Sequence, residues 1–121
     1  MGYNTDFDGF FDLSRALTIK ENNELEAIND KDWRDDHSRP DSYSFYCQWC
    51  SNDEGTQLIW NGREKFYGYI EWLEWLITNF FKPKHILLNG EVLWNGEEPM
   101  DLGKIIVKDS LIEVKKGSIT Y

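Results

Sequence analysis

Apolar and polar residues alternate at the beginning of the chain. In residues 3–13, Tyr3, Thr5 and Phe7 alternate with polar residues, and this pattern predicts a strand with one apolar face. Gly9 precedes two adjacent phenylalanines, so the apolar phase shifts there and a β-bulge is predicted. The chain is therefore expected to begin with a bulged strand.

A first helix is expected soon after this strand. Thr18 is a helix-capping residue type and Glu21 stands three positions later, which is the spacing of a capping box. A thin apolar stripe along residues 19–29 predicts a helix on the surface. Residues 29–44 carry charges without any period and predict a loop, in which Trp33 is the large apolar anchor.

A second helix gives the strongest periodic signal in the sequence. Residues 64–82, EKFYGYIEWLEWLITNFFK, place most of their apolar side chains on one half of a helical cylinder. Pro83 is expected to end this helix. Tyr67 and Trp75 break the pattern, because both fall on the polar half.

The other apolar segments alternate with a period of two. Residues 43–50 and 56–60 predict two strands joined as a hairpin. The last third of the chain is rich in strands, and its predicted tight turns are Asn89-Gly90, Asn95-Gly96 and Asp109-Ser110.

The order of these elements is β-α-β-β-α-β followed by a C-terminal hairpin. It predicts one α+β domain over residues 1–121, with an antiparallel or mixed sheet and two helices on one face. The first six elements match the split βαβ arrangement.

The net charge of −9 is unevenly distributed. Residues 1–54 hold 13 acidic and five basic residues, whereas residues 55–121 hold nine acidic and eight basic ones. Binding to nucleic acid through phosphates requires Lys and Arg, so a basic patch of that kind is excluded. No apolar run approaches the ~20 residues of a membrane span. We therefore expect a cytoplasmic protein that binds neither nucleic acid nor membrane.

Cys47 and Cys50 form a C-x-x-C sequence within a predicted strand. Neighbouring positions of a strand face opposite sides, so the two thiols are expected to point apart. Two cysteines are too few for a disulfide scaffold. His37 and His85 lack metal-ligand spacing to the cysteines, so we interpret the cysteines as structural and assign no metal or cofactor.

Other candidate chemistry is equally weak. Asp6 and Asp8 resemble the start of a calcium loop, but Arg15 stands where the bidentate Glu is required. The acidic residues of the 29–44 loop are interrupted by Lys and Arg. The sequence contains neither a Gly-rich phosphate loop nor a serine nucleophile motif, so no catalytic residue is assigned and the pattern does not point to an enzyme.

Aromatic residues beside carboxylates are the more informative feature. Tyr67 and Trp75 share the polar half of the second helix with Glu71 and Glu74. Tyr and Trp are enriched at protein interfaces. We therefore predict a protein-binding surface made of Tyr67, Glu71, Glu74 and Trp75, together with Trp33 of the loop.

Several blocks of sequence carry a resemblance. The chain contains GYNTDFDGFFDL, YCQW, EKFYGYIEWLEWL, LNGEVLWNGEE and GKIIVKD, in this order. With these blocks it resembles a family of small uncharacterised proteins of bacteria and tailed phages. Cys50 departs from the family pattern, which has an aliphatic residue after the Trp of YCQW. By analogy with small acidic phage proteins, the resemblance implies an inhibitor of a host or defence protein.

Three functions follow as hypotheses. The first is a non-enzymatic protein-binding module, of the phage inhibitor type. The second is a small ligand-binding domain or an enzyme of unassigned class, with a pocket between the sheet and the long helix or beside the acidic loop. The third is a self-assembling structural protein that pairs through the sheet edge of its C-terminal strands, which end at Tyr121.

Overall fold

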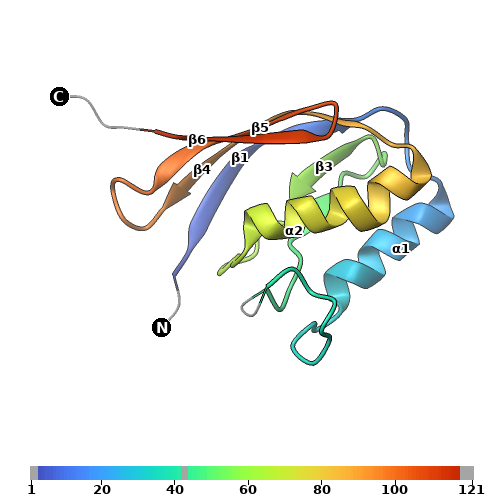
Figure 1. Cartoon of the computed structure of the whole chain (residues 1–121), viewed down its shortest axis with the longest axis horizontal. Coiled ribbons are helices and arrows are strands. Elements are labelled where there is room, and N and C mark those ends of the chain that lie inside the picture. The colour runs from blue at the N-terminus through green and yellow to red at the C-terminus, as the bar shows by residue number, and fades with distance from the viewer. Residues whose placement is uncertain (1–2, 42–43, 118–121) are drawn as a thin grey trace.

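The computed structural model describes residues 3–41 and 44–117. Within these residues, six strands form one antiparallel sheet in the order β2-β3-β1-β4-β5-β6 (Figure 1). The strands are β1 (Thr5–Leu13), β2 (Trp49–Ser51), β3 (Gln57–Trp60), β4 (Leu88–Gly96), β5 (Leu102–Lys108) and β6 (Leu111–Lys116). The predicted α+β class with an antiparallel sheet is confirmed.

The sheet is built from two interlocked split βαβ units. β1 and β2 run parallel with β3 between them, and β3 and β4 run parallel with β1 between them, since every hydrogen-bonded pair is antiparallel. The predicted split βαβ arrangement of the first six elements is therefore confirmed. β5 and β6 extend the sheet beyond β4 as a hairpin.

Both helices pack on the same face of the sheet (Figure 1). α1 (Ile19–Asp30) has the predicted bounds to within one residue, and its capping box is present. α2 (Tyr69–Leu76) continues into the π-helical turn η1 (Ile77–Phe81) and the short 3₁₀ helix η2 (Lys82–Lys84). None of the helices in residues 3–41 and 44–117 has the length and apolar character that crossing a bilayer requires.

The second helix starts five residues later than predicted. Lys65 and Gly68 have φ angles of 60° and 70°, in the left-handed region, so residues 64–68 cannot continue a right-handed helix. At its other end, the wide π turn keeps the adjacent Phe80 and Phe81 both buried. Pro83 lies in the terminal 3₁₀ turn, so the predicted end is confirmed.

Three predicted irregularities of the central strands are wrong, because the turn predicted at Asn95-Gly96 also lies within β4, which continues to Gly96. The register between β1 and β4 runs without interruption from Thr5 opposite Gly96 to Leu13 opposite Leu88, so there is no bulge at Gly9 and no turn at Asn89-Gly90. A Cβ on Gly9 would lie 2.4 Å from the carbonyl oxygen of Glu91, so glycine allows the two backbones to approach closely.

The other predicted turns and strands agree better with the structure. The Asp109-Ser110 turn is confirmed, with φ angles of 49° and 66° that match a type I′ hairpin turn. The strand predicted over residues 43–50 is shorter, because β2 covers Trp49–Ser51 alone. Before it, the backbone of residues 45–48 is irregular, and residue 43 lies outside the described residues, as does Tyr121.

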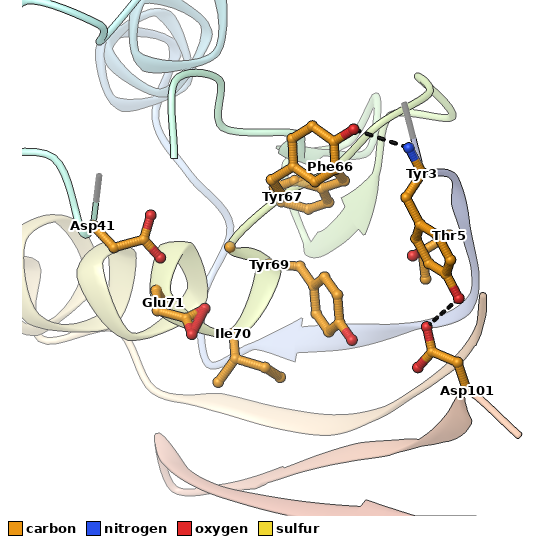
Figure 2. Close-up of a pocket in the computed structure, with 10 residues that line it drawn as sticks. Tyr3, Thr5, Asp41, Phe66, Tyr67, Tyr69, Ile70, Glu71 and Asp101 are labelled. Atoms are coloured by element: carbon orange, nitrogen blue, oxygen red, sulfur yellow. Dashed lines mark hydrogen bonds between the residues drawn. The ribbon is translucent and has the colours of Figure 1, made fainter. Parts of the chain in front are cut away.

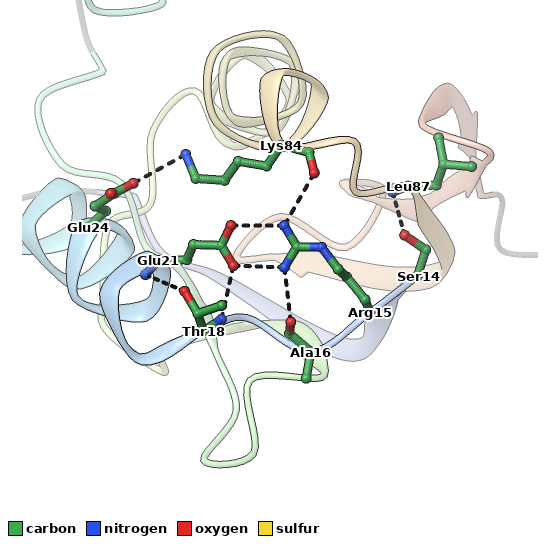
Figure 3. A network of polar contacts seen from close by, with 8 residues as sticks. All are labelled: Ser14, Arg15, Ala16, Thr18, Glu21, Glu24, Lys84 and Leu87. Atoms are coloured by element: carbon green, nitrogen blue, oxygen red, sulfur yellow. Dashed lines mark hydrogen bonds and ion pairs between the residues drawn. The ribbon is translucent and has the colours of Figure 1, made fainter.

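A polar network fixes the start of α1 to the chain segment that enters β4 (Figure 3). The Arg15 guanidinium donates to both carboxylate oxygens of Glu21, at 2.7 and 2.8 Å, and to the Lys84 carbonyl at 3.2 Å. Glu21 also accepts from the Thr18 backbone N–H at 2.9 Å. Lys84 in turn pairs with Glu24 at 3.2 Å.

This network makes stability depend on pH. The hydrogen bonds from Arg15, followed by the one from Thr18, lower the pKa of Glu21 from 4.5 to about 2. A lowered pKa in the folded state contributes stability above pH ~4.5, which is lost as the pH falls through ~2. We expect Glu21→Gln to be less stable than the wild type at pH 7, with a difference that shrinks as the pH falls below ~4.5.

Urea unfolding of both proteins between pH 7 and pH 3 measures this difference. Glu26→Gln, a substitution at an exposed position of the same helix, is the matched control and should leave the pH profile of the wild type unchanged. If the loss of unfolding free energy in Glu21→Gln stays constant with pH, the loss results from packing and not from the charge of Glu21.

Candidate functional site

A cleft of about 520 Å³ opens between the beginning of β1, the beginning of α2 and the loop between β4 and β5 (Figure 2). We call it the acidic cleft. Its lining residues are Tyr3, Thr5, Asp41, Phe66, Tyr67, Gly68, Tyr69, Ile70, Glu71 and Asp101.

The two left-handed residues before α2 shape one wall of the cleft. They direct Phe66 into the core, where it is 2 % exposed, and leave the Tyr67 side chain 41 % exposed. A Cβ on Gly68 would lie 2.0 Å from the Ser44 hydroxyl oxygen, and its φ of 70° also favours glycine. The Gly68 carbonyl then accepts from the Trp72 N–H at 2.8 Å, which starts the helix.

The opposite wall is held by Tyr3 and Asp101 (Figure 2). The Tyr3 hydroxyl donates to the Asp101 carboxylate at 2.6 Å, and the Trp94 indole N–H donates to its other oxygen at 3.0 Å. This hydrogen bond to a carboxylate raises the pKa of Tyr3. The Tyr3 backbone N–H donates to the Tyr67 hydroxyl at 2.9 Å and joins the two walls.

Tyr69 forms the floor of the cleft. Its ring packs on Phe7 and Trp94 at centroid distances of 5.0 and 6.0 Å. Tyr69 lines the cleft, and among the lining residues drawn in Figure 2 no hydrogen bond reaches its hydroxyl group. Burial, and then the nearby carboxylates of Asp101 and Glu71, raise the pKa of Tyr69 to about 12, so the phenol is neutral at physiological pH.

The cleft carries charge of one sign. Three carboxylates line it, those of Asp41, Glu71 and Asp101, and the lining includes no Lys, Arg or His. Tyrosine rings attract cations through their π faces, and carboxylates pair with them directly. The arrangement therefore suits an ammonium or guanidinium group and disfavours an anion.

The structure places four of the five predicted binding residues on one continuous surface. Tyr67 and Glu71 line the acidic cleft, and Glu71, Glu74 and Trp75 line an adjoining shallow hollow of about 230 Å³. Trp33 lies elsewhere. It is 6 % exposed and packs edge-on against other tryptophans, so its ring is part of the core.

Trp75 is half-buried and has a structural role as well. Its ring packs against Trp33 and Trp72 at centroid distances of 5.1 and 5.5 Å, and its indole N–H donates to the Ser38 carbonyl at 2.8 Å. This contact ties the 31–41 loop to α2. One edge of the ring still borders the shallow hollow.

Sequence reasoning missed Tyr3, Tyr69 and Asp101. Tyr69 falls on the apolar half of the helix pattern, which is typical of a core residue. Tyr3 and Asp101 are 98 positions apart in sequence and meet only through the pairing of β1 with β4. No local pattern signals either of them.

The two cysteines lie away from the cleft. Cys47 is 1 % exposed and its carbonyl accepts from the Asn29 side chain at 3.1 Å, while Cys50 is half-buried in β2. No group of three or more His, Cys, Asp or Glu in residues 3–41 and 44–117 has the arrangement of a metal site.

Comparison with models of known families, with curated proteins and with solved structures finds no match for this chain. The resemblance to small bacterial and phage proteins therefore stays a prediction from the sequence blocks.

Burial predicts different reactivities for the two thiols. Burial raises the pKa of Cys47 to about 12, and it also raises the pKa of Cys50, which is only half-buried. Because the thiolate is the reactive form, we expect a native-state alkylating agent to modify Cys50 slowly and Cys47 only after unfolding.

Mass spectrometry of alkylated peptides from folded and urea-unfolded protein measures both rates. The Cys50→Ser variant is the control and should show no labelling in the folded state. Rapid native labelling of Cys47 would contradict its buried position.

Proposed function

We propose that this chain is a non-enzymatic protein-binding module, which holds a basic side chain of its partner in the acidic cleft. The observation that carries the proposal is the lining itself, with three tyrosines, three carboxylates and no basic residue. A site of this composition offers a cation the faces of aromatic rings and charged hydrogen-bond acceptors.

The binding free energies of the individual contacts favour a segment of a protein over a free cation as the ligand. A cation–π contact at a partly exposed site contributes about 0.5–1 kcal/mol, and an exposed ion pair contributes ~0.2–1 kcal/mol. One cation in the acidic cleft would therefore bind weakly. The adjoining hollow supplies Glu74 and the edge of Trp75, so a segment with two basic side chains can use both sites through Glu71, which borders each.

The net charge of −9 adds long-range attraction for such a segment. A host or defence protein with an exposed basic segment is the partner class that agrees with the phage resemblance.

A peptide titration tests the proposal. We expect a short acetylated peptide with two arginines to bind the wild type at low ionic strength, and the same peptide with citrulline in place of arginine not to bind. Glu71→Gln removes one charge shared by the two sites and should weaken binding about three-fold, since ~0.7 kcal/mol corresponds to that factor. Shifts of backbone amide resonances near Tyr67 and Tyr69 report where the peptide sits.

Glu26→Gln makes the same change of charge on α1 and is the matched control. Equal binding of the arginine and citrulline peptides would overturn the proposal. If free arginine binds as tightly as the peptide, the site serves a small cationic ligand and the alternative of a ligand-binding domain is favoured.

Capture from the lysate of the host then identifies the partner. Tyr67→Ala combined with Glu71→Gln should abolish capture without loss of folding, because both side chains are exposed. Trp75 is a poor target for this test, because its ring packs on Trp33 and Trp72.

A further inference from the structure

The face of the sheet opposite the helices is uncovered in the described part of the chain (Figure 1). We call it the open face. Side chains alternate along a strand, so the even-numbered positions of β1 point to this face while Phe7 and Phe11 point to the core. Apolar side chains interrupt its polar surface, and Phe10 and Leu93 are 44 % and 50 % exposed.

Charge on the open face is separated by strand. β1 presents Asp6, Asp8 and Asp12. β5, on the other side of β4, presents Lys104 and Lys108. The sheet therefore carries an acidic strip and a basic strip with β4 between them.

The strand register places these side chains in rows across the sheet. One row contains Asp8, Leu93 and Lys104, which are paired through β4. The next row contains Phe10, Glu91 and Ile106. Beyond it, Asp12 pairs with Asn89, and Lys108 follows Val107, the last residue of β5 that pairs with β4.

This pattern is complementary to itself. A two-fold axis that runs along β4, between two facing sheets, places β1 of one copy on β5 of the other and keeps every row level. Asp8 then meets Lys104 of the second copy, Asp12 meets Lys108, and Phe10 packs on Ile106. An axis across the strands would instead place β1 on β1, with acidic side chains against acidic side chains.

We propose that the open face is a homodimer interface, in which two copies pack face to face about a two-fold axis along β4. Facing sheets pack about 10 Å apart and rotated by about 30°, so the best-matched contacts lie in the three central rows. The nine residues of β1 and β4 span about 30 Å, and the five strands from β3 to β6 that face the second copy span about 19 Å, so the projected face is at most ~600 Å², which approaches the ~800 Å² per partner of a standard interface.

The sheet edges are poorer candidates for self-association. β2, at one edge, has three residues, and β6, at the other, presents Glu113, Lys115 and Lys116 along an exposed strand. Short edge strands and charged side chains both oppose edge pairing. An unrelated basic partner would satisfy the acidic strip and be repelled by the basic one, whereas a second copy satisfies both.

Two residues oppose the dimer. Asp6 lies in the row of Asn95 and Leu102, so it meets Leu102 of the second copy and finds no basic partner there. Glu91 lies on the axis and faces its own copy, and like charges that face each other destabilise an interface. Glu91→Gln should therefore tighten the dimer, by about three-fold if ~0.7 kcal/mol of repulsion is removed.

Charge-reversed variants give the decisive experiment. The variant Asp8→Lys/Asp12→Lys has two basic strips, and the variant Lys104→Glu/Lys108→Glu has two acidic strips. Each is expected to be monomeric in sedimentation velocity over concentrations at which the wild type dimerises. An equimolar mixture restores both sets of pairs and should form a heterodimer as stable as the wild-type dimer.

Circular dichroism and thermal unfolding of each variant establish that the substitutions leave the fold intact. The proposal is overturned if the wild type stays monomeric at millimolar concentration, or if the mixture stays monomeric while the wild type dimerises. Reversed variants that still form homodimers would place the interface elsewhere. The acidic cleft is unchanged in all these variants, so the result is independent of the proposed function.

Discussion

The arrangement of this domain depends on the buried indole of Trp49. This residue lies on β2, the strand at one edge of the sheet, and its side chain is fully buried. Its ring packs on Phe7, Phe11 and Phe66 at centroid distances of 5.3–5.7 Å. Its N–H donates to the carbonyl of Tyr69, the first residue of α2, at 2.8 Å. One side chain thus joins the sheet to the point at which the second helix begins.

The acidic cleft is a consequence of that junction. Phe66 and Tyr69 pack with one side against the aromatic cluster around Trp49 and Phe7, and with the other side they line the cleft. The Trp49 bond fixes the start of α2, and therefore Tyr67 and Glu71 on either side of it. Because the cleft floor is a surface of the core, its shape does not rely on a mobile loop.

The sequence predicts the helices and the element order well, because both follow from side-chain periodicity and local capping. Thr18 and Glu21 form their capping box within a single turn, and the helix pattern of residues 69–81 reflects burial against the sheet. Periodicity failed where tertiary contacts set the backbone. An Asn-Gly pair favours a turn in isolation, yet Gly90 continues β4 because it pairs with Phe11 of the neighbouring strand β1.

The candidate site was predictable in part for the same reason. Tyr67 and Glu71 stand out because they depart from a strong local pattern. Tyr3 and Asp101 carry no such signal, because their proximity results from the register of β1 with β4 and from the loop that joins β4 to β5. Trp33 was misplaced because a loop position gives no indication that its ring fills the space between α1 and α2.

The alternation of side chains along β1 separates the acidic cleft from the open face. Thr5 points toward the acidic cleft, while Asp6 and Asp8 point to the open face. A dimer through the open face therefore leaves both clefts accessible. An axis along the strands also keeps the two clefts at the same end of the dimer, on opposite sides of it. Under the proposed function, two weak cation sites presented in this way would bind a single partner with two basic segments, and the second contact would form at a high effective concentration. The self-complementary face would thus raise the avidity of a cleft whose individual contacts are weak.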